Sequence, residues 1–434
     1  MSDSTLEQIL KLATQRADAA EVYFLSSQDT PIEFENNRLK SLQTKALRGV
    51  ALRVICNGRL GFVSSTDLTR LEDLVDAAIQ TAEIGDTAEF EFAKNVHVTA
   101  PKSNFIPPST QELVQVGENF IEQVRTYNSD ILVEVGFHVR SGSVKIATSD
   151  DVYAERSSNI ISASLGGNLV RGEDFLQAYS YDVSRDGVPD FDRILTEVLQ
   201  KYRWAEKPAS ISSGSFPVLF TPRAASSAIG RLFDTVLSGE TIVQKSSPLV
   251  DKIGETLFDE RLTLFEDPTL GPSACPFDDE GTPTRRKAFI EAGTVKGFYW
   301  DRRWGARAGL ESTGNGFRGG LSKPSPDMVN LCINPGKTPL SELISSMKSG
   351  LIVDQVLGAG QSNQLAGEFS VNLDLGYKVE NGEIVGRVKN TMVAGNIFEA
   401  FKNLVDFSDR PEWVGGGAYL PNMLFAELGV ASRE

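Results

Sequence analysis

Histidine is the side chain that most often binds zinc or transfers protons near neutral pH, and this chain of 434 residues contains only two. His97 and His138 lie far apart, each in a stretch with a β-strand pattern. A zinc site built from imidazoles normally shows paired histidines at helical or turn spacing. We therefore predict structural or surface roles for both. A Ser/His/Asp triad would need one of them, and the Gly-x-Ser-x-Gly nucleophile motif is missing from the sequence.

The cysteines give no better metal site. Cys56, Cys275 and Cys332 are widely separated and odd in number. This usage is typical of reduced thiols in a cytoplasmic protein, and it argues against a thiolate-bound metal.

An acidic run is the next candidate for chemistry. Asp278, Asp279 and Glu280 could bind a hard cation or act as a pair of catalytic carboxylates. Such a run is more often a solvated turn, here offset by the basic run that follows it, and we favour that interpretation.

Basic and aromatic residues form a second candidate surface. Guanidinium groups beside an aromatic ring are enriched where proteins contact partners or peptides. We predict partner or peptide contacts for Arg285, Arg286, Arg302, Arg303 and Trp304. A surface strip of ion pairs is the alternative.

The elements that must position these residues include paired hairpins. Apolar and polar residues alternate on both sides of Asn381-Gly382, which predicts a hairpin with a type I′ turn. Glu291-Ala-Gly repeats the pattern of Glu380-Asn-Gly and predicts a second hairpin of the same design. Apolar residues at three- and four-residue steps after Asn396 predict a short helix with Asn396 as its N-cap.

The chain as a whole predicts an α+β fold of two domains, rich in antiparallel hairpins and meanders with packed helices. The first domain covers residues 1–204: a helix–strands–helix unit to about residue 86, a connector, then a helix and a β meander. A Pro-, Ser- and Gly-rich stretch at 205–215 predicts a linker. The second domain covers 216–434, with a loop predicted from Ser408 onward.

Composition limits the classes of partner. A net charge of −15 and a pI near 4.8 argue against a protein that neutralises nucleic-acid phosphates. The N-terminus has acids where a secretory signal carries bases, and its apolar residues have helical spacing. No apolar run reaches membrane-spanning length. We expect a cytoplasmic protein that binds neither nucleic acid nor membrane.

Three segments in order resemble the TldD/PmbA family, bacterial proteins also called modulators of DNA gyrase. They are GVALRVICNGRLGFVSSTDL near the N-terminus, DDEGTPTRRKAFIEAGTVKGFYWD in the middle and VKNTMVAGNIFEAFKNL near the C-terminus. The TldD branch of that family resembles a zinc metallopeptidase with a His-Glu-x-x-x-His helix and a cysteine ligand near the C-terminus. The PmbA branch, also called TldE, lacks these residues and pairs with a TldD subunit in the proteolysis of small peptides.

This chain departs from the TldD pattern. Gly230, Arg231 and Thr235 stand roughly where the metal motif's His, Glu and His would be, and no cysteine follows Cys332. The resemblance is therefore to the PmbA/TldE branch, and it implies no metal or catalytic residue here, with zinc only on a TldD-like partner.

Three functions follow as hypotheses. The first is a non-catalytic PmbA/TldE-like subunit of a two-component zinc metallopeptidase, a hydrolase, working as a heteromer with a TldD-like subunit or as a homodimer. The second is a stand-alone peptide-binding or scaffold protein without a protease partner. The third is an independent hydrolase that uses the acidic run. Peptides are the expected substrate in each.

Overall fold

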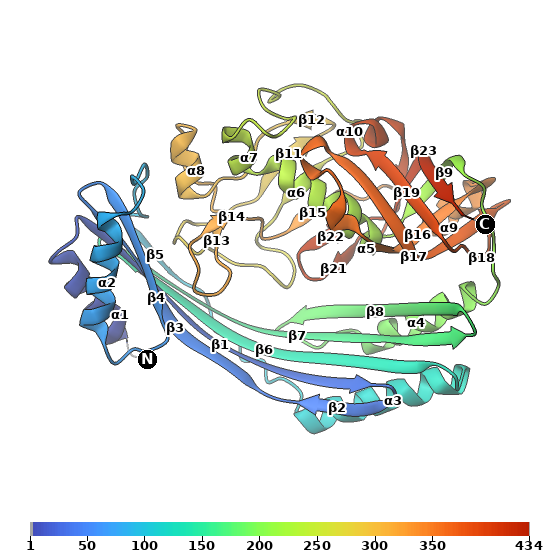
Figure 1. Cartoon of the computed structure of the whole chain (residues 1–434), viewed down its shortest axis with the longest axis horizontal. Helices are drawn as coiled ribbons and strands as arrows, with labels where there is room; N and C mark the ends of the chain where they lie inside the picture. Colours follow the sequence, from blue (N-terminus) through green and yellow to red (C-terminus); the bar gives the residue numbers. More distant parts are fainter. Residues whose placement is uncertain (1–2, 434) are drawn as a thin grey trace.

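A computed structural model describes residues 3–433, and it divides into a long curved sheet and a more compact C-terminal half (Figure 1). In the sheet the strands follow the order β4-β3-β1-β6-β7-β5, with β2 paired to β1 and β8 to β7. The strands are β1 (Ala19–Glu35), β2 (Arg38–Leu42), β3 (Lys45–Cys56), β4 (Arg59–Ser65), β5 (Val96–Thr99), β6 (Leu132–Thr148), β7 (Val152–Arg171) and β8 (Asp174–Arg185).

Helices cover one face of this sheet. They are α1 (Asp3–Thr14), α2 (Leu71–Glu83), α3 (Thr110–Tyr127) and α4 (Phe191–Trp204). Because side chains alternate across a strand, Val22 and Phe24 of β1 pack with α1 and α2, whereas Tyr23 points to the other face. On that other face Tyr23 shares a small apolar cluster with Phe277 of the C-terminal half. The sheet thus contacts helices on one side and C-terminal loops on the other.

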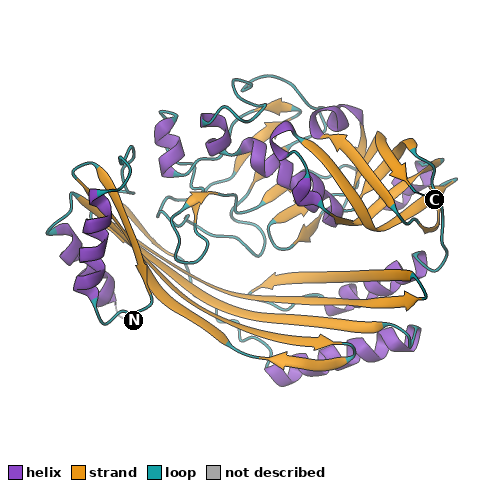
Figure 2. Cartoon of the chain, in the orientation of Figure 1, coloured by secondary structure: helices purple, strands orange, loops and turns teal. Residues whose placement is uncertain are grey.

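The C-terminal half is built on a seven-stranded sheet (Figure 2). Its strands are β9 (Gly214–Phe220), β16 (Ser349–Leu357), β17 (Glu368–Glu380), β18 (Glu383–Arg387), β19 (Thr391–Asn396), β20 (Leu404–Phe407) and β23 (Met423–Ser432). The order is β16-β9-β23-β19-β17-β18, and β20 pairs with β23. An additional pairing of β16 with β17, the first and fifth strands of this order, closes these five strands into a ring. That closure leaves few unpaired edges.

A second sheet of short strands lies beside the first, in the order β12-β11-β10-β15-β22-β21. Its strands are β10 (Leu264–Glu266), β11 (Lys287–Glu291), β12 (Thr294–Val295), β15 (Leu331–Ile333), β21 (Glu412–Val414) and β22 (Ala418–Leu420). The pair β13 (Gly316–Phe317) and β14 (Ser325–Pro326) is separate. The short helices are α5 (Pro222–Ala225), α6 (Arg231–Leu237), α7 (Gly239–Val243), α8 (Arg302–Arg307), α9 (Leu340–Ser346) and α10 (Ile397–Ala400).

The predicted α+β class and the predicted hairpins are confirmed. Asn381 and Gly382 have φ of 51° and 79°, as a type I′ turn between β17 and β18 requires. Ala292 and Gly293 repeat this geometry between β11 and β12, with φ of 46° and 73°. The Asn396 side chain accepts a hydrogen bond from the Phe398 N–H at 2.9 Å, so it caps α10 as predicted.

The prediction of a loop from Ser408 onward is wrong. The segment contains β21, β22 and β23, and β23 lies between β9 and β19 in the large sheet. Its residues alternate between buried and exposed positions near the C-terminus, with Leu428 and Val430 in the core. Tertiary pairing with β9 and β19 holds this strand in place.

The division at 205–215 stays a prediction. The stretch is mostly exposed, but Lys207 O accepts a hydrogen bond from Arg387 N–H and Ala209 N–H donates one to Arg387 O. One apolar core also spans both halves, because Tyr202 of α4 and Tyr377 of β17 belong to the same cluster. No described helix is long and apolar enough to cross a lipid bilayer.

Candidate functional site

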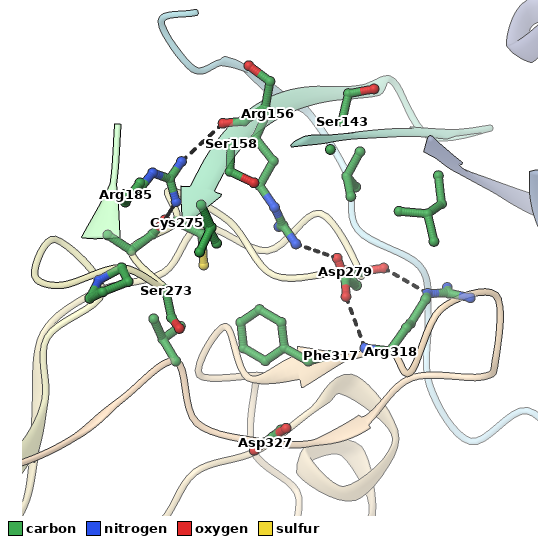
Figure 3. A pocket seen from close by; sticks show the side chains of 18 of the residues that line it. Ser143, Arg156, Ser158, Arg185, Ser273, Cys275, Asp279, Phe317, Arg318 and Asp327 are labelled. Carbon is green, nitrogen blue, oxygen red and sulfur yellow. Dashed lines mark hydrogen bonds and ion pairs between the residues drawn. The ribbon is translucent and has the colours of Figure 1, made fainter. Parts of the chain in front are cut away.

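A cavity of about 340 Å³ opens where the curved sheet meets the C-terminal half (Figure 3). Strands β6 and β7 supply Ser143, Arg156 and Ser158, and Arg185 ends β8. The facing wall comes from the C-terminal half. It includes Ser273, Cys275, Asp279, Phe317, Arg318 and Asp327. The site therefore exists only because two distant parts of the chain pack together.

Behind the cavity, buried charges join the two halves. Arg53 donates to Glu21 at 2.8 and 2.6 Å and to Glu280 at 3.0 Å, with its side chain 3% exposed. Arg318 donates a further bond to Glu21. Burial alone would raise the pKa of Glu21, but the Arg53 and Arg318 charges outweigh it, and the pKa is lowered. Glu21 is thus held ionised across the contact between β1, β3 and the C-terminal loops.

Asp279 forms the side of this network that reaches the cavity. Its carboxylate accepts from Arg156 at 2.6 Å and from the Arg318 N–H at 2.9 Å. The Arg156 guanidinium also lies over the Phe277 ring, 5.0 Å from its centroid. Figure 3 shows Asp279 between the two arginines.

The acidic run is therefore not the solvated turn that we predicted. Asp278, Asp279 and Glu280 are 0%, 4% and 0% exposed. The counter-charges of Asp279 and Glu280 are arginines distant in sequence and not the neighbouring basic run, which is why the local pattern misled. Asp278 accepts backbone N–H bonds from Glu280, Thr282 and Gly316 at 3.0, 2.8 and 2.9 Å. Burial, and then the nearby Glu280 charge, raise the pKa of Asp278. In the structure, therefore, Asp279 and Glu280 form ion pairs and Asp278 accepts the N–H bonds of a turn.

A second cavity of about 280 Å³ adjoins the first, since both are lined by Asp327 and Met328. Gly230, Arg231 and Asp234 line it together with the glycine-rich segment before β22. Burial, and then the Asp327 charge, raise the pKa of Asp234 to about 6. Burial also raises the pKa of Asp327.

The helix at this second cavity is interrupted by a π-helical turn at Ser226–Gly230, between α5 and α6. Turns of this kind are frequent at functional sites. A Cβ built on Gly230 would meet its nearest atom, Leu331 Cδ2, at 3.4 Å, an ordinary contact. The backbone at Gly230 therefore leaves room for a Cβ atom.

The residues at this position do not suit zinc. Arg231 is a cation and does not coordinate one, and Gly230 has no side chain. The Thr235 hydroxyl does not line the cavity but lies 3.0 Å from Arg231 O and 3.1 Å from Gln364 Oε1. Across residues 3–433, no group of three or more His, Cys, Asp or Glu side chains could hold a metal ion.

The five predicted contact residues separate into two places. Arg285 and Arg286 are exposed, and Arg286 lies over the Phe265 ring at 4.4 Å. Arg302, Arg303 and Trp304 begin α8, which contacts the connector after α2. There Arg303 pairs with Asp86 at 3.4 Å, and Arg302 donates to Glu91 O at 3.4 Å. Contact with a partner or peptide stays a prediction for all five.

Both histidines lie beside a carboxylate near the surface. His97 Nε2 is 3.2 Å from Asp151 Oδ2, and His138 Nδ1 is 3.2 Å from Asp29 Oδ2. Cys275 and Cys332 are buried, and all three cysteines are free thiols.

Sequence reasoning missed the cavity residues Arg156, Arg185 and Asp327, because isolated charged residues in strand or loop patterns give no local signal. The π-helical turn was also missed.

Fold and site together define a two-part α+β protein with a polar cleft between its halves. Comparison with known proteins identifies its family. Residues 213–432 match the PmbA/TldA metallopeptidase C-terminal domain, and residues 20–82 match PmbA/TldA metallopeptidase domain 1. The chain belongs to the PmbA/TldD family.

Relatives match over nearly the whole chain. A Methanocaldococcus jannaschii protein described as uncharacterized is 27% identical, covering 93% of this chain and 95% of its own. The metalloprotease PmbA of Escherichia coli O157:H7 is 24% identical, with 98% and 96% covered. The crystal structure of TldE from Thermococcus kodakarensis superposes with a TM-score of 0.88 at 25% identity, covering 99% of this chain and all of that one.

Proposed function

We propose that this chain is the non-catalytic, PmbA/TldE-type subunit of a two-component zinc metallopeptidase, with the metal on a TldD-like partner. One observation carries the proposal: the helix at the cleft has Gly230, Arg231 and Thr235 where the family's metal motif is expected. A zinc peptidase needs three protein ligands and a general base near the metal-bound water. Gly230 has no side chain, and neither Arg231 nor Thr235 can serve in either role.

The cleft suits the handling of peptides. Its two adjoining cavities of about 340 and 280 Å³ fall near the lower end of the range for small-ligand sites. Charged and hydroxyl side chains alternate in the first with the apolar side chains of Leu25, Phe317 and Val329. Such a surface can contact both the backbone and the side chains of a short peptide. The subunit would then supply walls to a shared chamber while the partner supplies the hydrolytic step.

Reconstitution tests the proposal. This chain and a TldD-like subunit carrying His-Glu-x-x-x-His are purified separately, and cleavage of a fluorogenic peptide library is measured for each alone and for the mixture. We expect activity only in the mixture, with saturation at a fixed ratio of subunits. Full cleavage by the TldD-like subunit alone, unchanged when this chain is added, would contradict the proposal. Binding of the library to this chain without any effect on a partner would favour the stand-alone peptide-binding protein.

A further inference from the structure

The adjoining cavities differ in the charged side chains that line them. Arg156 and Arg185 lie on the sheet side of the first cavity, and Asp327 lies on the opposite wall (Figure 3). Asp327 also lines the second cavity, where Asp234 and Arg231 are found. A ligand that spans both cavities would therefore pass from the guanidinium groups of the sheet wall to a region where Arg231 lies with the carboxyl groups of Asp234 and Asp327.

Of the three arginines that line the first cavity, Arg185 is the least closely paired with a carboxylate. Arg156 pairs closely with Asp279, and the Arg318 side chain is fully buried among its own partners. Arg185 instead donates to two neutral carbonyls, Ala274 O and Ser157 O. Its carboxylate partner is Asp186, in an ion pair whose Nε and Oδ2 atoms are 3.6 Å apart, against 2.6 Å for Arg156 and Asp279. A positive charge that is paired this loosely keeps more of its attraction for an anion in the cavity than one in a close ion pair.

The hydroxyl groups in the same cavity suit a carboxylate. Ser143, Ser158 and Ser273 line the same cavity, and each hydroxyl can donate one hydrogen bond. The Arg185 side chain is 22% exposed, so a ligand can reach it without unfolding the wall. Hydrogen bonds between ions of opposite charge are about twice as strong as those between neutral groups.

We propose that the cavity beside Arg185 binds a carboxylate of a peptide, with the rest of the peptide running past Met328 toward the cavity at Arg231. The inference rests on the proposed function, because it names the group by which this subunit recognises its peptide. Two sources of that carboxylate fit the chemistry: the C-terminus of the peptide, and an acidic side chain within it.

Three probe peptides distinguish these sources. They are N-acetyl-pentaalanine with a free C-terminus, the same peptide as C-terminal amide, and N-acetyl-Ala-Ala-Glu-Ala-Ala amide. Binding to this chain alone is measured by calorimetry at low salt. We expect at least one carboxylate-bearing peptide to bind about tenfold more tightly than the uncharged amide, the effect of one charge-assisted hydrogen bond. The tighter of the two identifies the source.

Variants assign the effect to Arg185. Arg185→Gln should bind all three peptides equally. Arg185→Lys keeps the charge and should retain the preference. Arg125→Gln, at an exposed position of α3 remote from the cavity lining, is the matched control and should behave as wild type.

Three results would overturn the inference: equal affinity of the wild type for all three peptides, no binding of any of them, or a folded Arg185→Gln that keeps the preference. Because no partner subunit is present, these results leave the two-component proposal standing. If reconstitution fails but the chain still discriminates among the peptides, the two-component proposal is contradicted and the carboxylate site stands.

Discussion

Arg53 lies between two carboxylates, Glu21 and Glu280, and its charge is removed from water by the contact of the two halves. A buried ion pair of this kind gains little over an apolar pair of the same shape. Removing one member is costly, because the other charge stays buried without a partner. The network therefore fixes how the sheet and the C-terminal loops fit together more than it adds to their stability.

Replacing Glu21 with Gln tests this role. The substitution keeps the shape but leaves Arg53 and Arg318 without their shared anion, so unfolding should require about 3 kcal/mol less free energy. Urea unfolding followed by tryptophan fluorescence measures the change. Glu399→Gln is the control, since the Glu399–Lys402 pair is 69% and 54% exposed and should contribute little. Equal effects of the two substitutions would contradict the structural role of the buried network.

The raised pKa of Asp234 predicts a specific dependence of the free energy of unfolding on pH. Its folded-state pKa is raised to about 6, above the ordinary value near 4, so the folded protein binds the extra proton between these values. The contribution of this group to the free energy of unfolding is fully present below pH 4 and is lost as the pH rises through 6. Asp234→Asn removes the titration, so the variant should gain about 2 kcal/mol relative to wild type between pH 4 and pH 7. Denaturant unfolding across that range measures the difference. A constant difference would show that Asp234 titrates normally.

At the scale of elements, two Asn-Gly turns form a matched pair: the one at Gly58 joins β3 to β4, and the one at Gly382 joins β17 to β18. Gly58 and Gly382 have φ of 74° and 79° in hairpins of the same type. A Cβ at Gly58 would meet nothing within 4 Å, whereas one at Gly382 would lie 2.7 Å from Ser345 O, in the backbone of α9.

Alanine at Gly58 and alanine at Gly382 should therefore lower the free energy of unfolding by different amounts. Gly58→Ala adds only the strain of a positive φ, about 1 kcal/mol, whereas Gly382→Ala must also displace α9 from the β17–β18 turn. We expect the second variant to be destabilised by at least about 1 kcal/mol more. Thermal or urea unfolding of both variants checks this, and equal losses would show that α9 does not pack tightly on the turn.

Elements with a complete local signal were predictable from sequence. Asn381-Gly382 sets both the turn type and the register of its hairpin, and Asn396 sets the start of α10. The acidic run was not predictable, because its partners Arg53, Arg156 and Arg318 come from strands and loops distant in sequence. The last strand was missed for the same reason, as β23 owes its place to pairing with β9 and β19.

At the scale of the whole molecule, the cleft depends on two halves that do not separate cleanly. Trp204 at the end of α4 stacks edge-to-face on Tyr377 of β17, with centroids 5.5 Å apart, inside a core that both halves share. The buried ion pairs hold the other end of the contact. A rigid frame of this kind can keep a peptide chamber in shape without containing the catalytic metal, as the proposed function requires.

The zinc content of this chain tests that central claim most directly. The purified chain and a TldD-like partner are each incubated with zinc, desalted and analysed by elemental mass spectrometry, alone and after separation from the reconstituted complex. We predict stoichiometric zinc on the partner and none on this chain, because Gly230, Arg231 and Thr235 offer no ligand set. One tightly held zinc per copy of this chain, together with peptide cleavage in the absence of any partner, would contradict the account.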